Sequence, residues 1–522
     1  MNTLAAATPG ASLLSRAIEF ARQRPSAVLA WVLGLHLLVW TALPILVCAN
    51  LQLDLVEDLA LGKEWQLGYW KHPPLPWWLA DALQQLTGQI DSVYLLGPLS
   101  AVLCLYVVWR LAREVASPIT ALTAVLALEG LHYYNFSVVK FAHDQMQLPF
   151  WALTGWYTFR AIAGKRSIDW VAAGAFLALA FWSKYAAFSL AATVGLILLF
   201  DPTARPAWRT RGPYLMAAAF LVVLGPNLWW LASNGFQPFH YVDNRAVEAT
   251  HWYQLVTFPL RWTVSQLFYL VPTIILIALL YGGHRPRRQN AGADFAHRYV
   301  AAFALGPFLV TTAVAALLGR LPVAMWGYPL WSFAPLAFLM WFPPDPDGRR
   351  LRHFAAVFAI LFVVFPAAYA ADELLEPLVK DRQKATHFPG RAMAEIVTRR
   401  WHEATGMPLR YVGGAPIAGG GGEFAANNLA VYSPDHPHVI VHGDPGLSAW
   451  IDRTDVDRRG GVLIWQGPSA MPEALRARFP RAQTQAPLVL PQITLAPNSP
   501  AVVHYAILPP SADAVPRALR QR

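Results

Sequence analysis

Residues 27–48 read AVLAWVLGLHLLVWTALPILVC, an apolar run without a charged side chain. About 20 apolar residues allow a helix to cross the hydrocarbon core of a bilayer. Further stretches of this kind follow along the chain, and we expect about eleven transmembrane helices. They lie near residues 27–48, 92–112, 116–134, 145–163, 168–185, 187–200, 213–232, 255–281, 297–318, 323–342 and 353–372.

The composition agrees with a membrane protein. Of the 522 residues, 56% are hydrophobic and 14% are charged, whereas soluble domains carry about 25% charged residues. This composition argues against a soluble enzyme, and the ample apolar surface excludes a disordered chain. Cys48 and Cys104 lie in apolar stretches, which predicts small core residues rather than a disulfide framework or a metal site.

The basic residues predict the orientation of the helices. With the N-terminus in the cytoplasm, most Lys and Arg of the short loops face the cytoplasm, including Arg16, Arg22 and Arg24. No small-residue cleavage site accompanies the first apolar run, so we expect an uncleaved first helix. The net charge of +10 is therefore interpreted as topology, and no nucleic-acid partner is expected. An odd number of helices places residues after 372 outside the cytoplasm.

Residues 373–522 have a different pattern, in which helix-like and β-rich runs alternate, typical of a small α/β domain. We therefore expect two domains, 1–372 and 373–522. The glycine run at 419–422 predicts a flexible loop rather than a phosphate cradle, because no Lys-Ser/Thr follows it. Helix is expected at 390–405 and 470–479, and strand at 409–412, 439–442, 462–465, 493–495 and 501–508.

The first outside loop, residues 50–91, is the richest in ionisable groups. It opens with LQLDLVEDLA at 51–60, which places Asp54, Glu57 and Asp58 on one helical face. One interpretation is the solvated face of an amphipathic helix on the membrane surface. The other is a carboxylate that acts as a general base, with a pKa raised by its neighbours.

The same loop continues with YWKHPPLPWWL at residues 69–79. Lys71 is a point charge suited to a phosphate, although a lysine that extends toward lipid headgroups is an equal alternative. The aromatic residues around it are typical of a membrane interface.

The acidic helix, Gly-x-x-Trp and the YWKHPPLP run together resemble the bacterial members of glycosyltransferase family 39. These are integral-membrane transferases of the C-type superfold, related to protein O-mannosyltransferases and to the lipid A aminoarabinose transferase. KFAHDQMQL at 140–148 resembles the family's Asp-x-x-x-Leu motif, and FWSKY at 181–185 is similar to its Leu-Ser-Lys motif. The resemblance covers about residues 45–190.

The resemblance implies transfer of a sugar from a polyprenyl-phosphate donor to an envelope acceptor, normally with inversion at the anomeric carbon. It places the reaction at the outer face of a bacterial inner membrane and the C-terminal domain in the periplasm. The acceptor can be lipid A or core, another lipid, a polysaccharide or a protein. Asp54 is the first choice as base, although Leu55 replaces the second acid of the family's common Asp-Glu pair, so Glu57 and Asp58 stay open.

The resemblance also suggests roles for the other candidates. Asp144 would support the acceptor or a catalytic hydrogen bond, or would merely cap a helix. Donor-phosphate binding is expected of Lys71, His72 and Lys184, and substrate binding of His143, Tyr69 and Trp70.

Three further questions stay open at this point. No cofactor is certain, and two isolated histidines leave only a weak case for a divalent metal. A transporter or flippase of a lipid-linked saccharide is the alternative function, but it predicts charges in the middle of spans. A non-catalytic scaffold would leave Asp54, Lys71 and Asp144 unexplained.

Overall fold

The structure is a computed structural model that describes residues 13–286, 294–344, 347–415 and 423–511. The chain forms two compact units. The first comprises Met1–Ala42, Leu95–Val139 and His143–Ala368, and the second Leu43–Tyr94, Lys140–Ala142 and Tyr369–Arg522. The first outside loop and the C-terminal segment thus share a unit. The predicted domain boundaries, 1–372 and 373–522, stay a prediction.

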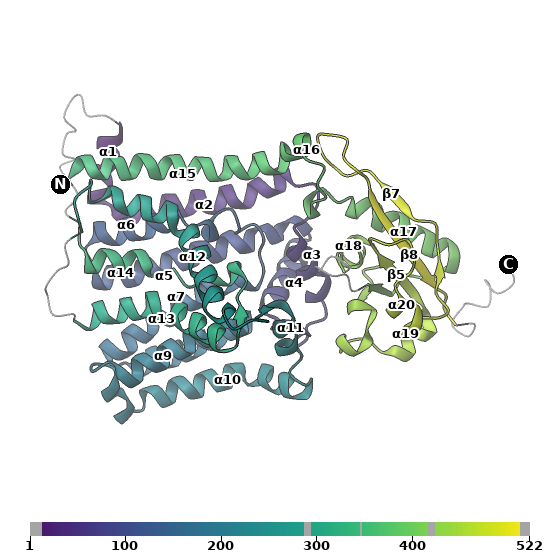
Figure 1. The fold of residues 1–522 in the computed structure, drawn as a ribbon, viewed down its shortest axis with the longest axis horizontal. Helices are drawn as coiled ribbons and strands as arrows, with labels where there is room; N and C mark the ends of the chain where they lie inside the picture. The colour runs from purple at the N-terminus through teal and green to yellow at the C-terminus, as the bar shows by residue number, and fades with distance from the viewer. Residues whose placement is uncertain (1–12, 287–293, 345–346, 416–422, 512–522) are drawn as a thin grey trace. The chain divides into compact units, whose positions relative to one another are not determined.

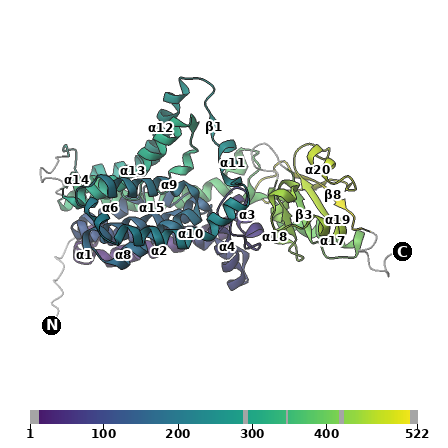
Figure 2. The same cartoon turned by 90° about the horizontal axis from the view of Figure 1, so that it is seen from below.

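Long helices build the first unit (Figure 1). Small residues let some of them approach closely, because a Cβ on Gly174 of α8 would lie 2.1 Å from the Met216 carbonyl oxygen of α10. Figure 2 shows α12 tilted against the other long helices. The helices are α1 Leu13–Gln23, α2 Pro25–Val47, α5 Leu96–Val115, α6 Pro118–Leu128, α7 His143–Gly164, α8 Ser167–Ser183, α9 Phe188–Phe200, α10 Gly212–Ser233, α11 Gln237–Arg245, α12 Gln254–Leu279, α13 Phe295–Leu317, α14 Ala334–Trp341 and α15 Gly348–Leu374.

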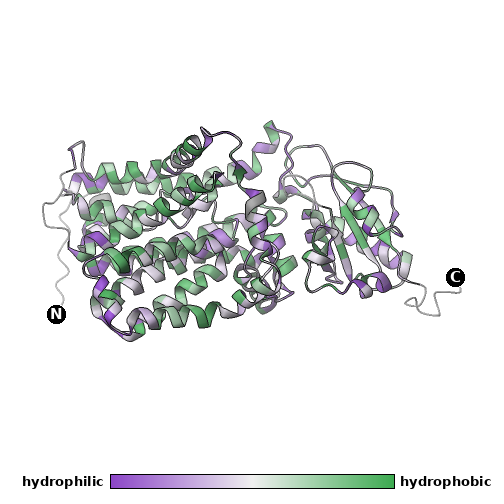
Figure 3. Cartoon of the chain, turned by 60° about the horizontal axis from the view of Figure 1, so that its bottom comes forward, coloured by the Kyte–Doolittle hydropathy of each residue, from purple (hydrophilic) through white to green (hydrophobic). Residues whose placement is uncertain are grey.

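A helix lies at each of the eleven predicted positions. Among the described residues, six helical segments are long and apolar enough to cross a membrane, and they contain α2, α5, α10, α12, α13 and α15. Apolar residues, drawn in green, are frequent along the long helices (Figure 3). The chain is therefore a helical integral membrane protein, as predicted.

Two of the predicted helices are shorter than expected. The stretch 116–134 contains α6 and then turns, and a Cβ on Gly130 would lie 2.7 Å from the Thr273 nitrogen of α12. The stretch 323–342 holds the 3-10 turn Ala324–Gly327 before α14 begins at Ala334. Hydropathy reports apolar surroundings, and it does not distinguish a helix from buried turns.

The first outside loop folds into two helices, α3 Leu53–Gly62 and α4 Leu75–Thr87. They pack closely, because a Cβ on Gly62 would lie 2.2 Å from the Trp77 carbonyl oxygen. The predicted acidic helix is therefore present. It is not a solvated face, since Asp58 is 1% exposed.

A six-stranded sheet with order β4-β3-β5-β8-β6 and β7 beside β8 organises the C-terminal segment. β3 runs parallel to β4 and β5, whereas β8 is antiparallel to β5, β6 and β7. The predicted α/β pattern is confirmed. The elements are α16 Glu376–Val379, α17 Gly390–Thr405, β3 Tyr411–Gly414, α18 Phe424–Tyr432, β4 His438–Ile440, α19 Arg453–Arg459, β5 Gly461–Trp465, α20 Glu473–Arg478, β6 Gln483–Thr484, β7 Leu488–Leu490 and β8 Ala501–Leu508.

One strand of this segment was wrongly predicted. Residues 493–495 form no strand, and the preceding β7 at Leu488–Leu490 pairs with β8 instead. The side chains of Ile493 and Leu495 are exposed, so their apolar character does not reflect a place in the sheet. The glycine run at 419–422 lies outside the described residues.

Candidate active site

Helix α3 presents the three predicted carboxylates in different environments. Asp54 lies in the first turn and is half-buried, as is Glu57, whereas Asp58 is buried. Burial, and then the charges of Asp54 and Glu57, raise the pKa of Asp58 well above its usual value; Lys71 and a hydrogen bond with Trp77 oppose this shift. Burial therefore favours the neutral form of Asp58.

Lys71 and Glu57 form an ion pair, with 2.6 Å between Nζ and Oε2. The two side chains are 15% and 12% exposed. The other carboxylate oxygen of Glu57, Oε1, is buried without a hydrogen-bond partner among the described residues. Lys71 also lies 5.8 Å from the centre of the Trp70 ring. The loop thus gathers one cation and three acids within two turns of helix and a neighbouring bend.

The aromatic residues of the loop have structural contacts. Tyr69 is fully buried, donates a hydrogen bond to the Leu61 carbonyl oxygen at 2.9 Å, and packs edge-on against Trp77 at 4.2 Å. His72 is half-buried, and its carbonyl oxygen accepts from the Tyr69 amide at 3.1 Å. These contacts shape the bend that carries Lys71. The substrate roles of Tyr69 and Trp70, and the phosphate role of His72, stay predictions.

Two residues of the C-terminal segment lie beside this loop, and the sequence reasoning missed both. Glu423 is 9% exposed and accepts from the His442 amide at 2.6 Å. The His442 ring lies edge-on to Trp70, with 4.7 Å between ring centres. The sequence did carry a signal for Glu423, because it is an ionisable residue that immediately precedes the largely apolar run of residues 424–432.

Both residues have shifted pKa values. Burial and the negative charge of Glu57 raise the pKa of Glu423 to about 7, against Lys71 and the His442 amide. Burial and the positive charge of Lys71 lower the pKa of His442. The electrostatics of the loop and the C-terminal segment are thus linked.

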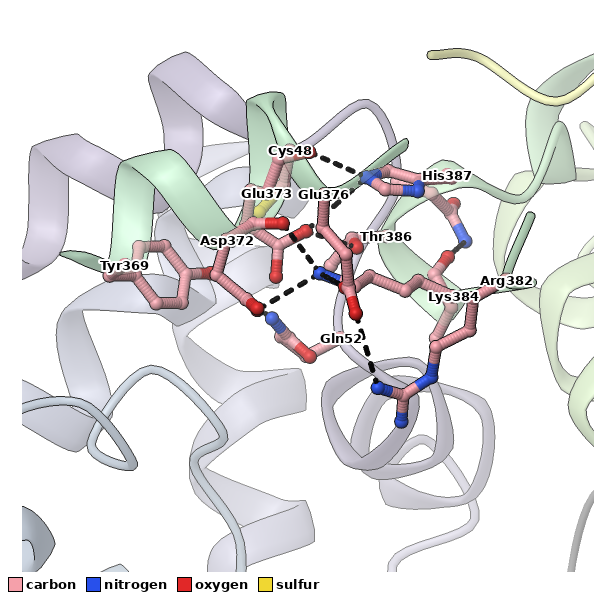
Figure 4. Close-up of polar contacts among 12 residues, drawn as sticks. Cys48, Gln52, Tyr369, Asp372, Glu373, Glu376, Arg382, Lys384, Thr386 and His387 are labelled. Carbon is pink, nitrogen blue, oxygen red and sulfur yellow. Dashed lines mark hydrogen bonds and ion pairs between the residues drawn. The ribbon is translucent and has the colours of Figure 1, made fainter. Parts of the chain in front are cut away.

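The start of the loop is fastened to the chain that follows α15. Asn50 donates to the Ala385 carbonyl oxygen and to Asn428 Oδ1, both at 3.0 Å. Nearby, Lys384 lies among acidic side chains, 2.6 Å from Glu376 Oε2 and 2.9 Å from Asp372 Oδ2 (Figure 4). The Asn50 hydrogen bonds hold the residues that lead into α3.

The first unit contains the second predicted charge pair. Lys184 Nζ lies 2.6 Å from Asp144 Oδ1, and the side chains are 11% and 9% exposed. Asp144 and the buried His143 lie in the first turn of α7, whereas Lys184 follows the C-terminus of α8. Each predicted lysine therefore contacts an acidic candidate of its own unit, Lys71 with Glu57 and Lys184 with Asp144.

The first unit also contains a hydrogen-bonded pair of ionisable residues that the sequence reasoning missed. His36 Nδ1 lies 3.0 Å from Glu129 Oε2, and both residues are buried. His36 is in the middle of α2. The ionisable residues of interest are therefore not confined to the outer ends of the predicted spans. Both residues lie in predicted spans, and an ionisable residue within an apolar span already marks a candidate functional residue in the sequence.

Within the described ranges, no group of three or more His, Cys, Asp or Glu side chains is arranged to hold a metal ion.

Comparison with known proteins identifies relatives. Residues 71–230 match the family described as dolichyl-phosphate-mannose-protein mannosyltransferase. This range contains Lys71, His72, His143, Asp144 and Lys184. The lipid A galacturonosyltransferase RgtD of Rhizobium johnstonii is 29% identical over 239 residues, which are 43% of this chain and 47% of RgtD. The chain thus matches about half the length of that relative.

Two further proteins are similar over most of their length. The lipopolysaccharide core galacturonosyltransferase RgtB of the same organism is 22% identical, over 82% of this chain and 84% of RgtB. The crystal structure of ArnT from Cupriavidus metallidurans bound to undecaprenyl phosphate has a TM-score of 0.60 and 12% identity, and covers 92% of this chain and 98% of ArnT. These comparisons confirm the predicted family resemblance. The ArnT match also agrees with the predicted class of fold, and the names of RgtD and RgtB agree with the predicted enzyme class, glycosyltransferase. The number of transmembrane helices stays a prediction.

Proposed function

We propose that the chain is an integral-membrane glycosyltransferase that moves a sugar from a polyprenyl-phosphate donor to an envelope acceptor, with inversion at the anomeric carbon. The observation that carries this proposal is the Lys71–Glu57 pair beside Asp54 in the first outside loop. A cation for the donor phosphate and a carboxylate for the acceptor are the groups that this reaction needs.

Asp54 is the best candidate for the base. Burial favours the neutral form of Asp58, and Glu57 pairs with Lys71. Asp54 stands in the first turn of α3, where the partial positive charge of the helix N-terminus favours an ionised carboxylate. The structure thus supports Asp54 over its two neighbours.

The proposed reaction is a single displacement. An acceptor hydroxyl oxygen attacks the anomeric carbon and forms the new glycosidic bond while the bond from that carbon to the phosphate oxygen breaks. The hydroxyl proton passes to Asp54, and the bonding electrons leave with the polyprenyl phosphate. Lys71 and Lys184 stabilise the negative charge that develops on that phosphate, with His72 beside Lys71. Asp144 holds Lys184 in place and supports the acceptor.

We also propose the topology. Eleven transmembrane helices within residues 1–372 would place the two ends of this region on opposite sides of the membrane, with the N-terminus in the cytoplasm. The α/β domain of 373–522 and the loop of 50–91 would then lie in the periplasm. The basic residues of the alternate loops support this orientation. The Lys71 group would face the outer surface, where lipid-linked sugars meet envelope acceptors.

The names of the relatives suggest the substrates. RgtD and RgtB are named as galacturonosyltransferases of lipid A and of the lipopolysaccharide core, respectively. We therefore propose a hexuronic acid as the sugar and lipid A or core as the acceptor; a glycan or a protein is the alternative acceptor.

Mass spectrometry of lipid A and core from a deletion strain tests this proposal. Loss of one hexuronic acid residue, restored by the wild-type gene, is expected, and an unchanged envelope would contradict it. Transfer measured after chelation would decide whether a divalent metal takes part.

The buried His36–Glu129 pair favours a second candidate, a transporter or flippase of a lipid-linked saccharide. Ionisable pairs at membrane depth mark proton or substrate pathways. Movement of a fluorescent polyprenyl-phosphate sugar across liposomes by wild type, and its loss in His36→Ala, would support transport. The transferase proposal expects no such movement.

A further inference from the structure

Glu423 connects the C-terminal segment to the charge group of the first loop. It accepts the His442 amide at 2.6 Å, and the His442 ring lies on Trp70, the residue next to Lys71. Its carboxyl interacts electrostatically with Glu57 and Lys71. The group therefore comprises one cation and two acids from different parts of the chain, and all of them are largely buried.

The charge on Glu423 changes what Lys71 can bind. A donor phosphodiester carries one negative charge, and it must share the Lys71 ammonium with Glu57, which keeps its ion pair. An ionised Glu423 adds a second competing anion, whose repulsion is strong in a largely buried setting. A protonated Glu423 removes that repulsion and leaves its hydrogen bond from His442 in place.

We propose that Glu423 is a positioning residue of the donor site: its protonated carboxyl leaves Lys71 able to bind the phosphate of the lipid-linked donor, and its carboxylate opposes that binding. This inference rests on the proposed function. The C-terminal domain then sets the affinity of the site for the donor. The transition falls near neutral pH, because burial and Glu57 raise the pKa of Glu423 to about 7. Burial and Lys71 lower the pKa of His442, whereas Glu57 and Asp444 act in the opposite sense. The His442 Nε2 atom lies 3.6 Å from Glu423 Oε1, and the lowered pKa favours its neutral form.

The test is a binding measurement on the purified full-length protein. The probe is a short-chain polyprenyl methyl phosphate, a phosphodiester whose single charge does not change near neutral pH. Wild type is expected to bind it about tenfold more tightly at low pH, about 5.5, than at about 8.5. Glu423→Gln keeps the shape and the hydrogen-bond acceptor of the side chain, and is expected to bind equally at both pH values with the affinity of low-pH wild type.

Two further variants control the test. Glu423→Asp retains a carboxyl and should retain the pH effect. Glu395→Gln removes an exposed acid of the same segment and should behave as wild type. In a transfer assay at about pH 8.5, Glu423→Gln should lower the KM for the donor and leave kcat nearly unchanged.

The outcomes separate this inference from the proposed function. A pH effect that persists in Glu423→Gln, or that is absent from wild type, would overturn the inference while donor binding stands. Failure of wild type to bind the probe at either pH would overturn the proposed function, and the inference with it.

Discussion

Lys71 donates a hydrogen bond to Glu57 at 2.6 Å, and this pair joins the bend of the first outside loop to helix α3. Both side chains are largely buried. A buried cation without its partner is costly, so the pair has a structural consequence as well as a proposed chemical one.

The two members of this pair should depend on each other. Lys71→Met and Glu57→Gln are each expected to lower the free energy of unfolding by about 3 kcal/mol, because each leaves one buried charge uncompensated. The double variant should lose less than the sum of the two. Chemical unfolding in detergent measures all three, with Lys140→Met, an exposed lysine, as the control. Additive losses would show that the pair is not coupled.

Asp58→Asn should preserve transfer and stabilise the protein. The pKa of Asp58 is higher in the folded state than in the unfolded state. At a pH between these two pKa values, the folded state therefore binds more protons than the unfolded state. The stability that Asp58 contributes is therefore complete below about pH 4 and is lost as pH rises through the folded pKa. The thermal unfolding temperature of wild type should fall more steeply with rising pH than that of Asp58→Asn. Parallel profiles of unfolding temperature against pH, or loss of transfer in Asp58→Asn, would show that Asp58 acts in its ionised form.

Lys184 should matter for transfer through its charge. Lys184→Met is expected to reduce transfer about 100-fold and to leave Asp144 buried without its cation. Lys184→Arg keeps the charge but not the geometry and should recover part of the activity. Initial rates of transfer measure both. Wild-type rates in Lys184→Met would remove Lys184 from the site.

The contacts drawn in Figure 4 predict a difference between two neighbouring basic residues. Lys384 is 12% exposed and lies within 3 Å of both Asp372 and Glu376, so Lys384→Met should destabilise the protein by about 2 kcal/mol. Arg382 is 68% exposed and 3.7 Å from Glu376, so Arg382→Met should cost less than about 0.5 kcal/mol. Equal effects in thermal unfolding would contradict the difference in burial and pairing between Lys384 and Arg382.

Hydropathy and periodicity predict the helices well, because each apolar stretch has one dominant physical cause, removal from water. They fail at residues 323–333 and 493–495. There, apolar side chains belong to turns or to an exposed segment, and tertiary packing decides the backbone. The helical spacing of Asp54, Glu57 and Asp58 correctly predicts their common element, but it does not reveal that Asp58 is buried.

The residues that contact the charged side chains are harder to predict from the sequence. Lys71 and Glu57 are close in the chain, whereas Glu423 and His442 come from strand connections hundreds of residues away. Only the folded sheet brings those connections to Trp70. His36 and Glu129 show the opposite case, since each is visible as a polar residue inside an apolar run, and their pairing is what the structure adds.

The central claim is that this chain transfers a sugar from a lipid-linked donor with Asp54 as base. The most direct measurement is transfer of a radiolabelled sugar from a polyprenyl-phosphate donor to lipid A or core by purified wild type and Asp54→Asn. We expect transfer by wild type and a rate at least about 100-fold lower for a correctly inserted Asp54→Asn. Equal rates would contradict the role of Asp54, and no transfer by wild type with any donor would contradict the enzymatic function.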